Sequence, residues 1–293
     1  MKAQTQTPSS RPFDPIVTAK PVCAIKEVAT QPAYWQNIQP SDNRGPGKRQ
    51  TPLVKTRPYH LFLTEEDINQ VKQRPDYDKI GSTAVRERAI NKLYQNCIKQ
   101  QGIRQVVLLG ARYDIRALKK GKTYQENKKH AAIYGKTTFW EIDKAEILTQ
   151  KQQLLANHNV DPNANYISCD YLQGNFVAKL LEAGVDPQSE TLFIWEGNLM
   201  YLTSKQQLDS IFKALKEGFA KFTLVFDYFE QTFLDELKSD FWRQGIANIK
   251  LFAAEHQLKL KFDKDIASLA IEYEVDSKPS SEKSRYHVCA LGI

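Results

Sequence analysis

The chain has 293 residues, of which 41% are hydrophobic and 26% are charged, a balance typical of a globular protein with a sizeable buried core. The formal net charge is +7, but no nucleic-acid-binding motif accompanies it, so we expect a solvated basic surface and no nucleic-acid partner. No apolar run is long enough to cross a membrane, and Met1 is not followed by the apolar segment of a signal peptide. The four cysteines form no CxxC pair, which argues against zinc or a disulfide framework and favours a reducing, cytoplasmic location.

Residues 1 to about 60 differ from the rest of the chain, because they hold most of the prolines and few apolar runs. We expect an N-terminal extension that is disordered over its first dozen residues and partly helical beyond them. Segment 15–29 has the apolar spacing of a short helix, and Thr64 with Asp67 predicts a capping box at the start of another. A longer helix is predicted from Ser82 to Gly102, and residues 82–293 are expected to form the main domain.

Strands and helices alternate from residue 105 onward. The predicted strands are 105–110, 137–143, 165–170, 191–197 and 222–229, and helices are expected at 144–158, 176–184, 204–219 and within 231–256. Two more predicted strands, 269–275 and 285–293, follow each other without a helix and are expected to form a hairpin. This order predicts an α/β fold with a doubly wound, mostly parallel seven-stranded sheet whose last strand is antiparallel.

Each of the five alternating strands ends next to a carboxylate. In an open α/β sheet, ligands bind outside the carboxyl ends of the strands. Asp143 follows the second strand, where a carboxylate typically accepts hydrogen bonds from ribose hydroxyls. Asp170 follows the third strand and could accept a hydrogen bond from an adenine amino group, with Tyr171 or Leu172 against the ring. The pattern predicts a cofactor that contains adenosine.

Two other uses of these residues are disfavoured. A metal centre is not expected, because the acids come from different strands and no histidine lies at ligand spacing from them. A Ser-His-Asp hydrolase is not expected either, because the chain has no G-x-S-x-G segment.

Four segments, taken in order, resemble the leucine carboxyl methyltransferase family, which also includes bacterial polyketide O-methyltransferases. They are RQVVLLGARYDIRAL (104–118), FWEIDKAEILTQKQQLL (139–155), YISCDYLQ (166–173) and TLFIWEGNLMYL (191–202). The resemblance covers roughly residues 82–230. It implies a class I methyltransferase sheet that binds S-adenosylmethionine, with residues 1–81 forming a helical lid. The implied activity is methyl transfer to a carboxylate or hydroxyl of a small molecule or a peptide C-terminus.

The resemblance also implies roles for individual residues around the cofactor. Its methionine part would lie beside the loop that contains Gly110, Ala111 and Asp114. The acids at the end of the second strand, Glu141 and Asp143, would face the ribose, with Asp143 as the first choice. Asp170 and Tyr171 would lie on the adenine side.

Further residues would lie near the reacting centre. Glu196 corresponds to an acid that faces the amino end of the cofactor, and Tyr201 is a candidate on the acceptor side, together with Asn198 and Tyr228. Arg86 corresponds to an arginine that holds the cofactor carboxylate, a bidentate task that suits a guanidinium. Lys20 corresponds to an N-terminal lysine with a similar task, and Arg88 and Arg57 are rivals of Arg86.

The chain departs from the family pattern at two places. The family reads G-A-G where this chain reads Gly110-Ala111-Arg112, so a side chain and a cation replace a glycine that usually allows a positive φ. Residues 119–136 hold an extra basic stretch, which we expect to be a solvated surface loop.

Arg112 leaves two other functions open. The chain could be a catalytically inactive methyltransferase fold that binds a partner, or a nicotinamide reductase with a poor dinucleotide fingerprint. An inactive module would tolerate the loss of Asp143 and Asp170, and both are present. The sequence therefore favours the enzyme.

Overall fold

A computed structural model of the protein describes residues 15–29, 31, 58–74, 81–120, 134–274 and 281–293. Within them lies one seven-stranded sheet in the order β3-β2-β1-β4-β5-β7-β6. Only β7 runs antiparallel to its neighbours, β5 and β6, as the doubly wound pattern predicts. The strands are β1 (Gln105–Leu109), β2 (Thr138–Asp143), β3 (Asn165–Ser168), β4 (Thr191–Trp195), β5 (Phe222–Phe229), β6 (Lys259–Asp265) and β7 (Tyr286–Gly292).

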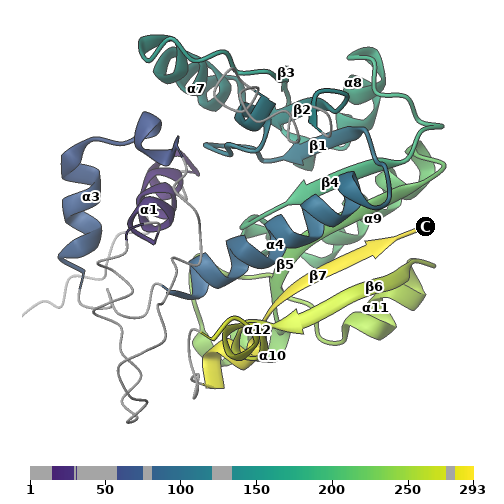
Figure 1. Ribbon diagram of the computed structural model, residues 1–293. Coiled ribbons are helices and arrows are strands. Elements are labelled where there is room, and N and C mark those ends of the chain that lie inside the picture. The colour runs from purple at the N-terminus through teal and green to yellow at the C-terminus, as the bar shows by residue number, and fades with distance from the viewer. Residues whose placement is uncertain (1–14, 30, 32–57, 75–80, 121–133, 275–280) are drawn as a thin grey trace, which may run out of the picture.

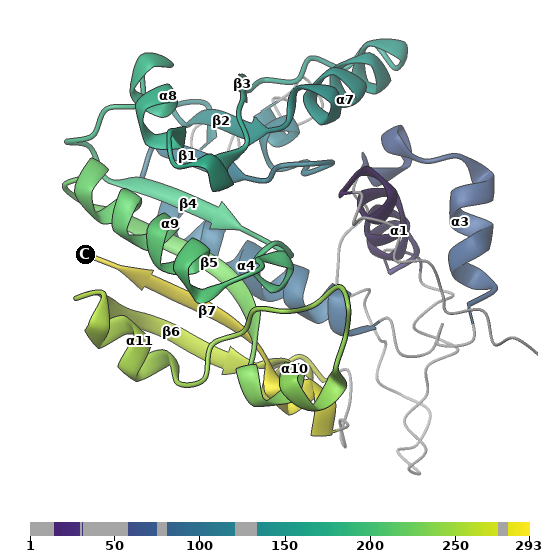
Figure 2. The same cartoon turned by 180° about the vertical axis from the view of Figure 1, so that it is seen from behind.

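Helices cover both faces of this sheet, and their apolar faces form two core layers. One face packs against α8 (Phe176–Glu182), α9 (Lys205–Gly218) and α11 (Ile249–Glu255), with Trp195 and Phe212 fully buried between them. The other face packs against α4 (Gly81–Lys99) and α12 (Ile266–Glu272). Figure 1 shows α4 in front of the sheet, and Figure 2 shows α8, α9 and α11 on the opposite face. Because both faces are covered, all eight residues of β5 are buried.

The N-terminal elements lie beyond the carboxyl ends of the parallel strands (Figure 1). They are α1 (Pro15–Val28), the 3-10 helix η1 (Pro58–Phe62) and α3 (Glu65–Lys72). The predicted capping box is present, because the Thr64 side chain accepts from the Asp67 N–H and Asp67 accepts from the Thr64 N–H. Apolar residues of α1 pack against α3 and α4, and η1 packs against α7 (Ala145–Asn157). The division of the chain at residues 81 and 82 stays a prediction.

The prediction of a strand at 269–275 is wrong. Residues 269–272 lie in α12, in which Ile266, Leu269 and Ala270 are buried and Ile271 is 54% exposed, which is a helical spacing. The sixth strand is instead β6, whose exposed lysines kept it from resembling a buried strand. Strands β6 and β7 do pair, but α12 and the 3-10 helix η6 (Ser281–Arg285) separate them, so they do not form a simple hairpin.

Three further expectations from the sequence concern a helical region, membrane spans and a basic stretch. The predicted helical region 231–256 consists of α10 (Gln231–Leu237) and α11, with an irregular segment between them. Among the helices that the structure describes, none combines the length and the apolar character needed to cross a bilayer. Most of the basic stretch 119–136 lies outside the described residues.

Candidate active site

A cavity of about 770 Å³ lies where the described strands β1 and β4 end. These two strands are neighbours at the point where the strand order reverses, which is the usual ligand position in an open α/β sheet. Side chains from α1, η1 and α4 close one side of it, and aromatic residues from β5, α10 and β7 close another. The predicted site residues that line it are Arg86, Gly110, Ala111, Asp114, Glu196 and Tyr201.

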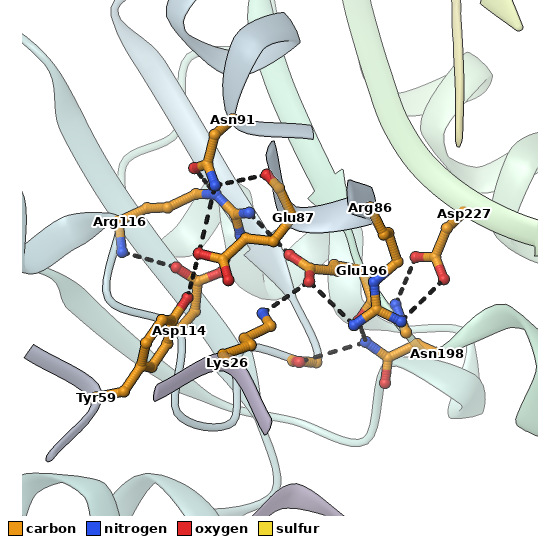
Figure 3. Close-up of polar contacts among 12 residues, drawn as sticks. Lys26, Tyr59, Arg86, Glu87, Asn91, Asp114, Arg116, Glu196, Asn198 and Asp227 are labelled. Carbon is orange, nitrogen blue, oxygen red and sulfur yellow. Dashed lines mark hydrogen bonds and ion pairs between the residues drawn. The ribbon is translucent and has the colours of Figure 1, made fainter. Parts of the chain in front are cut away.

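Glu196 is the centre of the charge network in this cavity (Figure 3). One carboxylate oxygen lies 2.7 Å from the Lys26 ammonium and 3.1 Å from the Arg86 guanidinium, and the other accepts from Arg116 at 2.8 Å. Burial alone would raise the pKa of Glu196, but Lys26, Arg116 and Arg86 together hold it well below its ordinary value. Glu196 is therefore an anion that is poorly suited to accept a proton.

Arg86 is held from two sides. One guanidinium nitrogen donates to the Tyr286 hydroxyl at 2.6 Å and lies 3.5 Å from Asp227, and another donates to Glu196. Asp227 in turn accepts from the N–H of Gly197 at 2.6 Å. Of the rivals of Arg86, Arg88 packs over the Tyr273 ring, with its guanidinium carbon 4.5 Å from the ring centroid, and Arg57 lies outside the described residues.

Arg116 is a site residue that sequence reasoning did not identify. Its side chain is only 2% exposed and donates to Asp114, to Glu196 and, at 3.2 Å, to the Asn91 side chain. Asp114 also accepts from the backbone N–H of Arg116 at 2.7 Å. The available signal was its position two residues after Asp114, in the same loop. Through its bonds to Asp114 and Glu196, Arg116 links the loop after β1 to the end of β4.

Two lysines of α1 lie in different surroundings. Lys20, the predicted site lysine, is 3.5 Å from Asp67 and lies outside the cavity lining. Lys26, six residues later, reaches Glu196 and is 10% exposed. The 3-10 helix η1 is tied to the same region, because the Tyr59 hydroxyl donates to Glu87 at 2.6 Å. The N-terminal elements therefore contribute directly to the walls of the cavity.

Glu141 is fully buried and lies outside the lining of the cavity. It forms an ion pair of 2.5 Å with Lys151 of α7, and Lys151 also donates to the Asp114 carbonyl at 2.6 Å. Burial raises the pKa of Glu141 to about 7, although Lys151 acts in the opposite direction. In this structure Glu141 is joined through Lys151 to the loop that contains Asp114.

Asp143 and Arg112 meet at the end of β2. The Asp143 carboxylate accepts from the backbone N–H groups of Arg112 and Lys144, both at 2.8 Å. Arg112 has a φ of 43°, so it adopts the left-handed conformation that a glycine would take more easily. The Arg112 side chain does not point away from the cavity: the residue lines it, and the guanidinium carbon lies 5.5 Å from the centroid of the Tyr201 ring.

Position 110 requires a glycine, because the Asn198 side chain lies against it. A Cβ on Gly110 would lie 2.8 Å from the Asn198 amide, and the φ of Gly110 is +63°. The Asn198 amide donates to the carbonyls of Leu109, Gly110 and Glu196, at 3.3, 3.4 and 2.8 Å. These bonds hold the ends of β1 and β4 together, so Asn198 supports the site from within the protein.

Asp170 and Tyr171 lie further along the edge of the sheet and outside the cavity lining. Asp170 accepts from the N–H of Leu172 at 3.1 Å, and the Tyr171 hydroxyl accepts from the Trp195 indole at 3.2 Å. Burial raises the pKa of Tyr171 to about 12. Leu172 is 39% exposed, so it is the more accessible of the two residues expected near an adenine ring.

Two remaining expectations concern Tyr228 and metal ions. Tyr228 faces away from the cavity, where its hydroxyl donates to Asp263 at 3.1 Å. In the part of the chain that the structure describes, no three His, Cys, Asp or Glu residues are grouped in a way that could hold a metal ion.

Comparisons with known proteins agree with this architecture. The sequence model of the leucine carboxyl methyltransferase family matches residues 27–216. A protein of Mycolicibacterium smegmatis, named for S-adenosyl-L-methionine-dependent methyltransferase activity, is 26% identical over 200 residues. The match covers 67% of this chain and only 56% of that relative, so the chain spans little more than half of its length.

The structures that resemble this chain include two crystal structures that match more than nine-tenths of it. One, from Thermobifida fusca and named for methyltransferase activity, has a TM-score of 0.54 at 15% identity over 97% of this chain and 98% of that one. The other, a DUF574 family protein from Streptomyces avermitilis, has a TM-score of 0.54 at 11% identity over 91% and 98%. At these identities the likeness concerns the fold alone. With its class I methyltransferase sheet and the match over residues 27–216, the chain belongs to the leucine carboxyl methyltransferase family, whose cofactor is S-adenosylmethionine.

Proposed function

We propose that the protein is an S-adenosylmethionine-dependent O-methyltransferase, acting on a carboxylate or hydroxyl of a small molecule or a peptide C-terminus. The observation that carries the proposal is the cavity at the ends of β1 and β4, with Glu196 between Lys26 and Arg86. S-adenosylmethionine would supply a methyl group already activated by the positive sulfonium.

The charges of the cavity fit the amino-acid end of this cofactor. A free amino acid end carries one ammonium and one carboxylate, and the cavity presents the Glu196 carboxylate beside the Arg86 guanidinium and the Lys26 ammonium. In our proposal Glu196 binds the ammonium, and Arg86 and Lys26 bind the carboxylate. Asp114, held by Arg116, keeps the loop after β1 in place.

The adenosine end fits the neighbouring strand ends. Asp143 accepts two backbone hydrogen bonds, and a carboxylate has about four lone-pair sites, so it retains capacity for ribose hydroxyls. Asp170 and the exposed Leu172 lie after β3, where we place the adenine ring. In our proposal, the hydrogen bond between the Trp195 indole and the Tyr171 hydroxyl stabilises the segment beside the adenine ring. Glu141 has an indirect role, through its ion pair with Lys151.

The protein's own contribution to the reaction is mainly position and the exclusion of water. Lys26 and Tyr59 bring the N-terminal elements over the cavity, and Tyr201 lies on the side left for the acceptor. No histidine is among the described residues that line the cavity, and Glu196 is held as an anion by three cations. A carboxylate acceptor needs no base, so these groups suit it better than an alcohol.

Calorimetric titration with S-adenosylmethionine and S-adenosylhomocysteine tests this proposal. We expect both to bind the wild type and to bind Asp143→Ala at least about tenfold more weakly, because charge-assisted hydrogen bonds are lost. Glu146→Ala, an exposed acid of α7, is the matched control and should bind like the wild type. If neither compound binds the wild type, the enzyme proposal is wrong and the fold is an inactive binding module.

A further inference from the structure

Arg112 and Tyr201 both line the cavity, and the Arg112 guanidinium lies over the Tyr201 ring. We propose, on the basis of the proposed methyltransferase function, that Arg112 binds the carboxylate of an aromatic acid and that this acid is the methyl acceptor. The geometry behind the proposal is a cation over one aromatic ring beside a wall of further aromatic rings.

Arg112 differs from the other cations of the cavity. Lys26 and Arg86 are paired with Glu196, and Arg74 and Lys283 also have interactions of their own. Among the described residues, the guanidinium of Arg112 forms no direct ion pair with a carboxylate, and it lies over the Tyr201 ring. Its charge acts on the nearby Asp143, where it opposes the rise in pKa that burial causes. A guanidinium lying on an aromatic ring keeps its N–H donors free at the edge, where a planar carboxylate can bind.

An aromatic wall continues from this position. The Phe229 ring is stacked against Tyr286, with centroids 4.1 Å apart, and against Trp242 at 5.1 Å. Phe233 packs on Phe229 at 5.5 Å, and all four rings line the cavity. The segment that carries Trp242 is fixed beside Tyr201, because the N–H of Arg243 donates to the Met200 carbonyl at 2.8 Å.

These features together indicate a flat, anionic acceptor. Stacked and edge-on aromatic contacts favour another ring, and the Arg112 guanidinium beside the wall favours a negative group on that ring. A cation close to a sulfonium is unfavourable by itself, and the carboxylate of the acceptor would cancel the Arg112 charge. The position that carries a glycine in the family pattern thus becomes a specificity position here.

The charges of the reaction balance for such an acceptor. The S–CH3 bond of the sulfonium breaks and an O–CH3 bond to the carboxylate forms, giving a thioether and a methyl ester. The sulfonium loses its positive charge, the carboxylate loses its negative charge, and no proton leaves. The ester is neutral, so it no longer pairs with Arg112, which favours its release.

Calorimetric titration with 2-naphthoate, in the presence of S-adenosylhomocysteine, tests this inference. We expect 2-naphthoate to bind Arg112→Gly at least about tenfold more weakly than the wild type, because a charge-assisted pair is lost. Three controls should match the wild type: binding of the neutral 2-naphthamide to Arg112→Gly, binding of S-adenosylhomocysteine to Arg112→Gly, and binding of 2-naphthoate to Arg88→Met, whose guanidinium packs over Tyr273 outside the cavity lining. Hexanoate, an acid without a ring, should bind the wild type at least about tenfold more weakly than 2-naphthoate.

Each alternative result has one meaning. Unchanged binding of 2-naphthoate to Arg112→Gly, an equal loss for the amide, or no binding of 2-naphthoate to the wild type overturns the inference. Equal binding of hexanoate overturns its aromatic part. Loss of S-adenosylhomocysteine from Arg112→Gly assigns Arg112 to the cofactor instead. Failure of S-adenosylhomocysteine to bind the wild type refutes the proposed function itself.

Discussion

The Lys26 ammonium lies 2.7 Å from the Glu196 carboxylate, and both side chains are at least nine-tenths buried. This ion pair joins the N-terminal helix α1 to the acid that follows β4. Because two arginines share the same carboxylate, the cavity holds a compact group of charges that no single segment of the chain could form.

Lys26→Met should weaken binding of S-adenosylhomocysteine by about tenfold, because one of two cations proposed for the carboxylate is lost. It should also lower the free energy of unfolding by up to about 3 kcal/mol, since Glu196 remains buried with fewer partners. Lys20→Met on the same helix is the matched control and should change the free energy of unfolding by less than about 0.5 kcal/mol. Calorimetry and urea unfolding measure both effects. Equal effects of the two variants would contradict the account.

Glu141 should make the free energy of unfolding depend on pH between about pH 4.5 and pH 7. Its pKa is about 7 in the folded protein against 4.5 ordinarily, so between these values the folded state holds a proton that the unfolded chain has released. The contribution of Glu141 to the free energy of unfolding is therefore complete below about pH 4.5 and falls as the pH rises to about 7. The double variant Glu141→Gln/Lys151→Met should lose this slope in urea unfolding at several pH values. An unchanged slope would show that Glu141 does not titrate in this range.

Gly110→Ala should lower the free energy of unfolding by about 2 kcal/mol or more, because the new methyl meets Asn198 and the φ is positive. In an Asn198→Ala background the collision is removed, so the same change should cost only about 1 kcal/mol, from the backbone alone. A double-mutant cycle by urea unfolding measures the difference. Equal costs in both backgrounds would rule out the steric contact.

Arg112→Gly should raise the free energy of unfolding by about 0.5–1 kcal/mol, since glycine adopts a φ of 43° without the penalty of a Cβ. The N–H that donates to Asp143 is kept. Asn159→Gly is the control, because Asn tolerates its φ of 55° and the gain should be smaller. If Arg112→Gly is less stable than the wild type, the side chain of Arg112 stabilises the fold more than its backbone strains it.

Much of the fold could be predicted because buried parallel strands have a simple signature. The run from Val106 to Leu109 and the fully buried β5 are continuous apolar segments, and the alternation with helices indicates the topology. The edge strand β6 could not be recognised, because its three lysines are exposed and its other four residues are only partly buried. The sequence predicts a strand where α12 lies, because LAIEYEV (269–275) alternates in the way a strand does. Only the packing of Leu269 and Ala270 distinguishes the helix from a strand.

The site was predictable where a residue follows a strand and less so where its role depends on tertiary contacts. Glu196 comes directly after β4 and Asp114 lies in the loop that follows β1, and the structure brings both to the cavity. Lys26 and Arg116 resemble surface cations in the sequence, and only the folded chain shows that both pair with Glu196. Glu141 lies two residues before Asp143, yet it is buried in the interior and forms an ion pair with Lys151 of α7.

The central claim is that Arg86 and Glu196 hold the amino-acid end of the cofactor. The most direct test compares calorimetric titrations of S-adenosylhomocysteine and of adenosine, which lacks that end, with the wild type, Arg86→Met and Arg88→Met. The account predicts that Arg86→Met binds S-adenosylhomocysteine at least about tenfold more weakly and adenosine within about twofold of the wild type, while Arg88→Met binds both normally. Adenosine binding shows that the variant is folded. Unchanged binding of S-adenosylhomocysteine to Arg86→Met would contradict the assignment of the site.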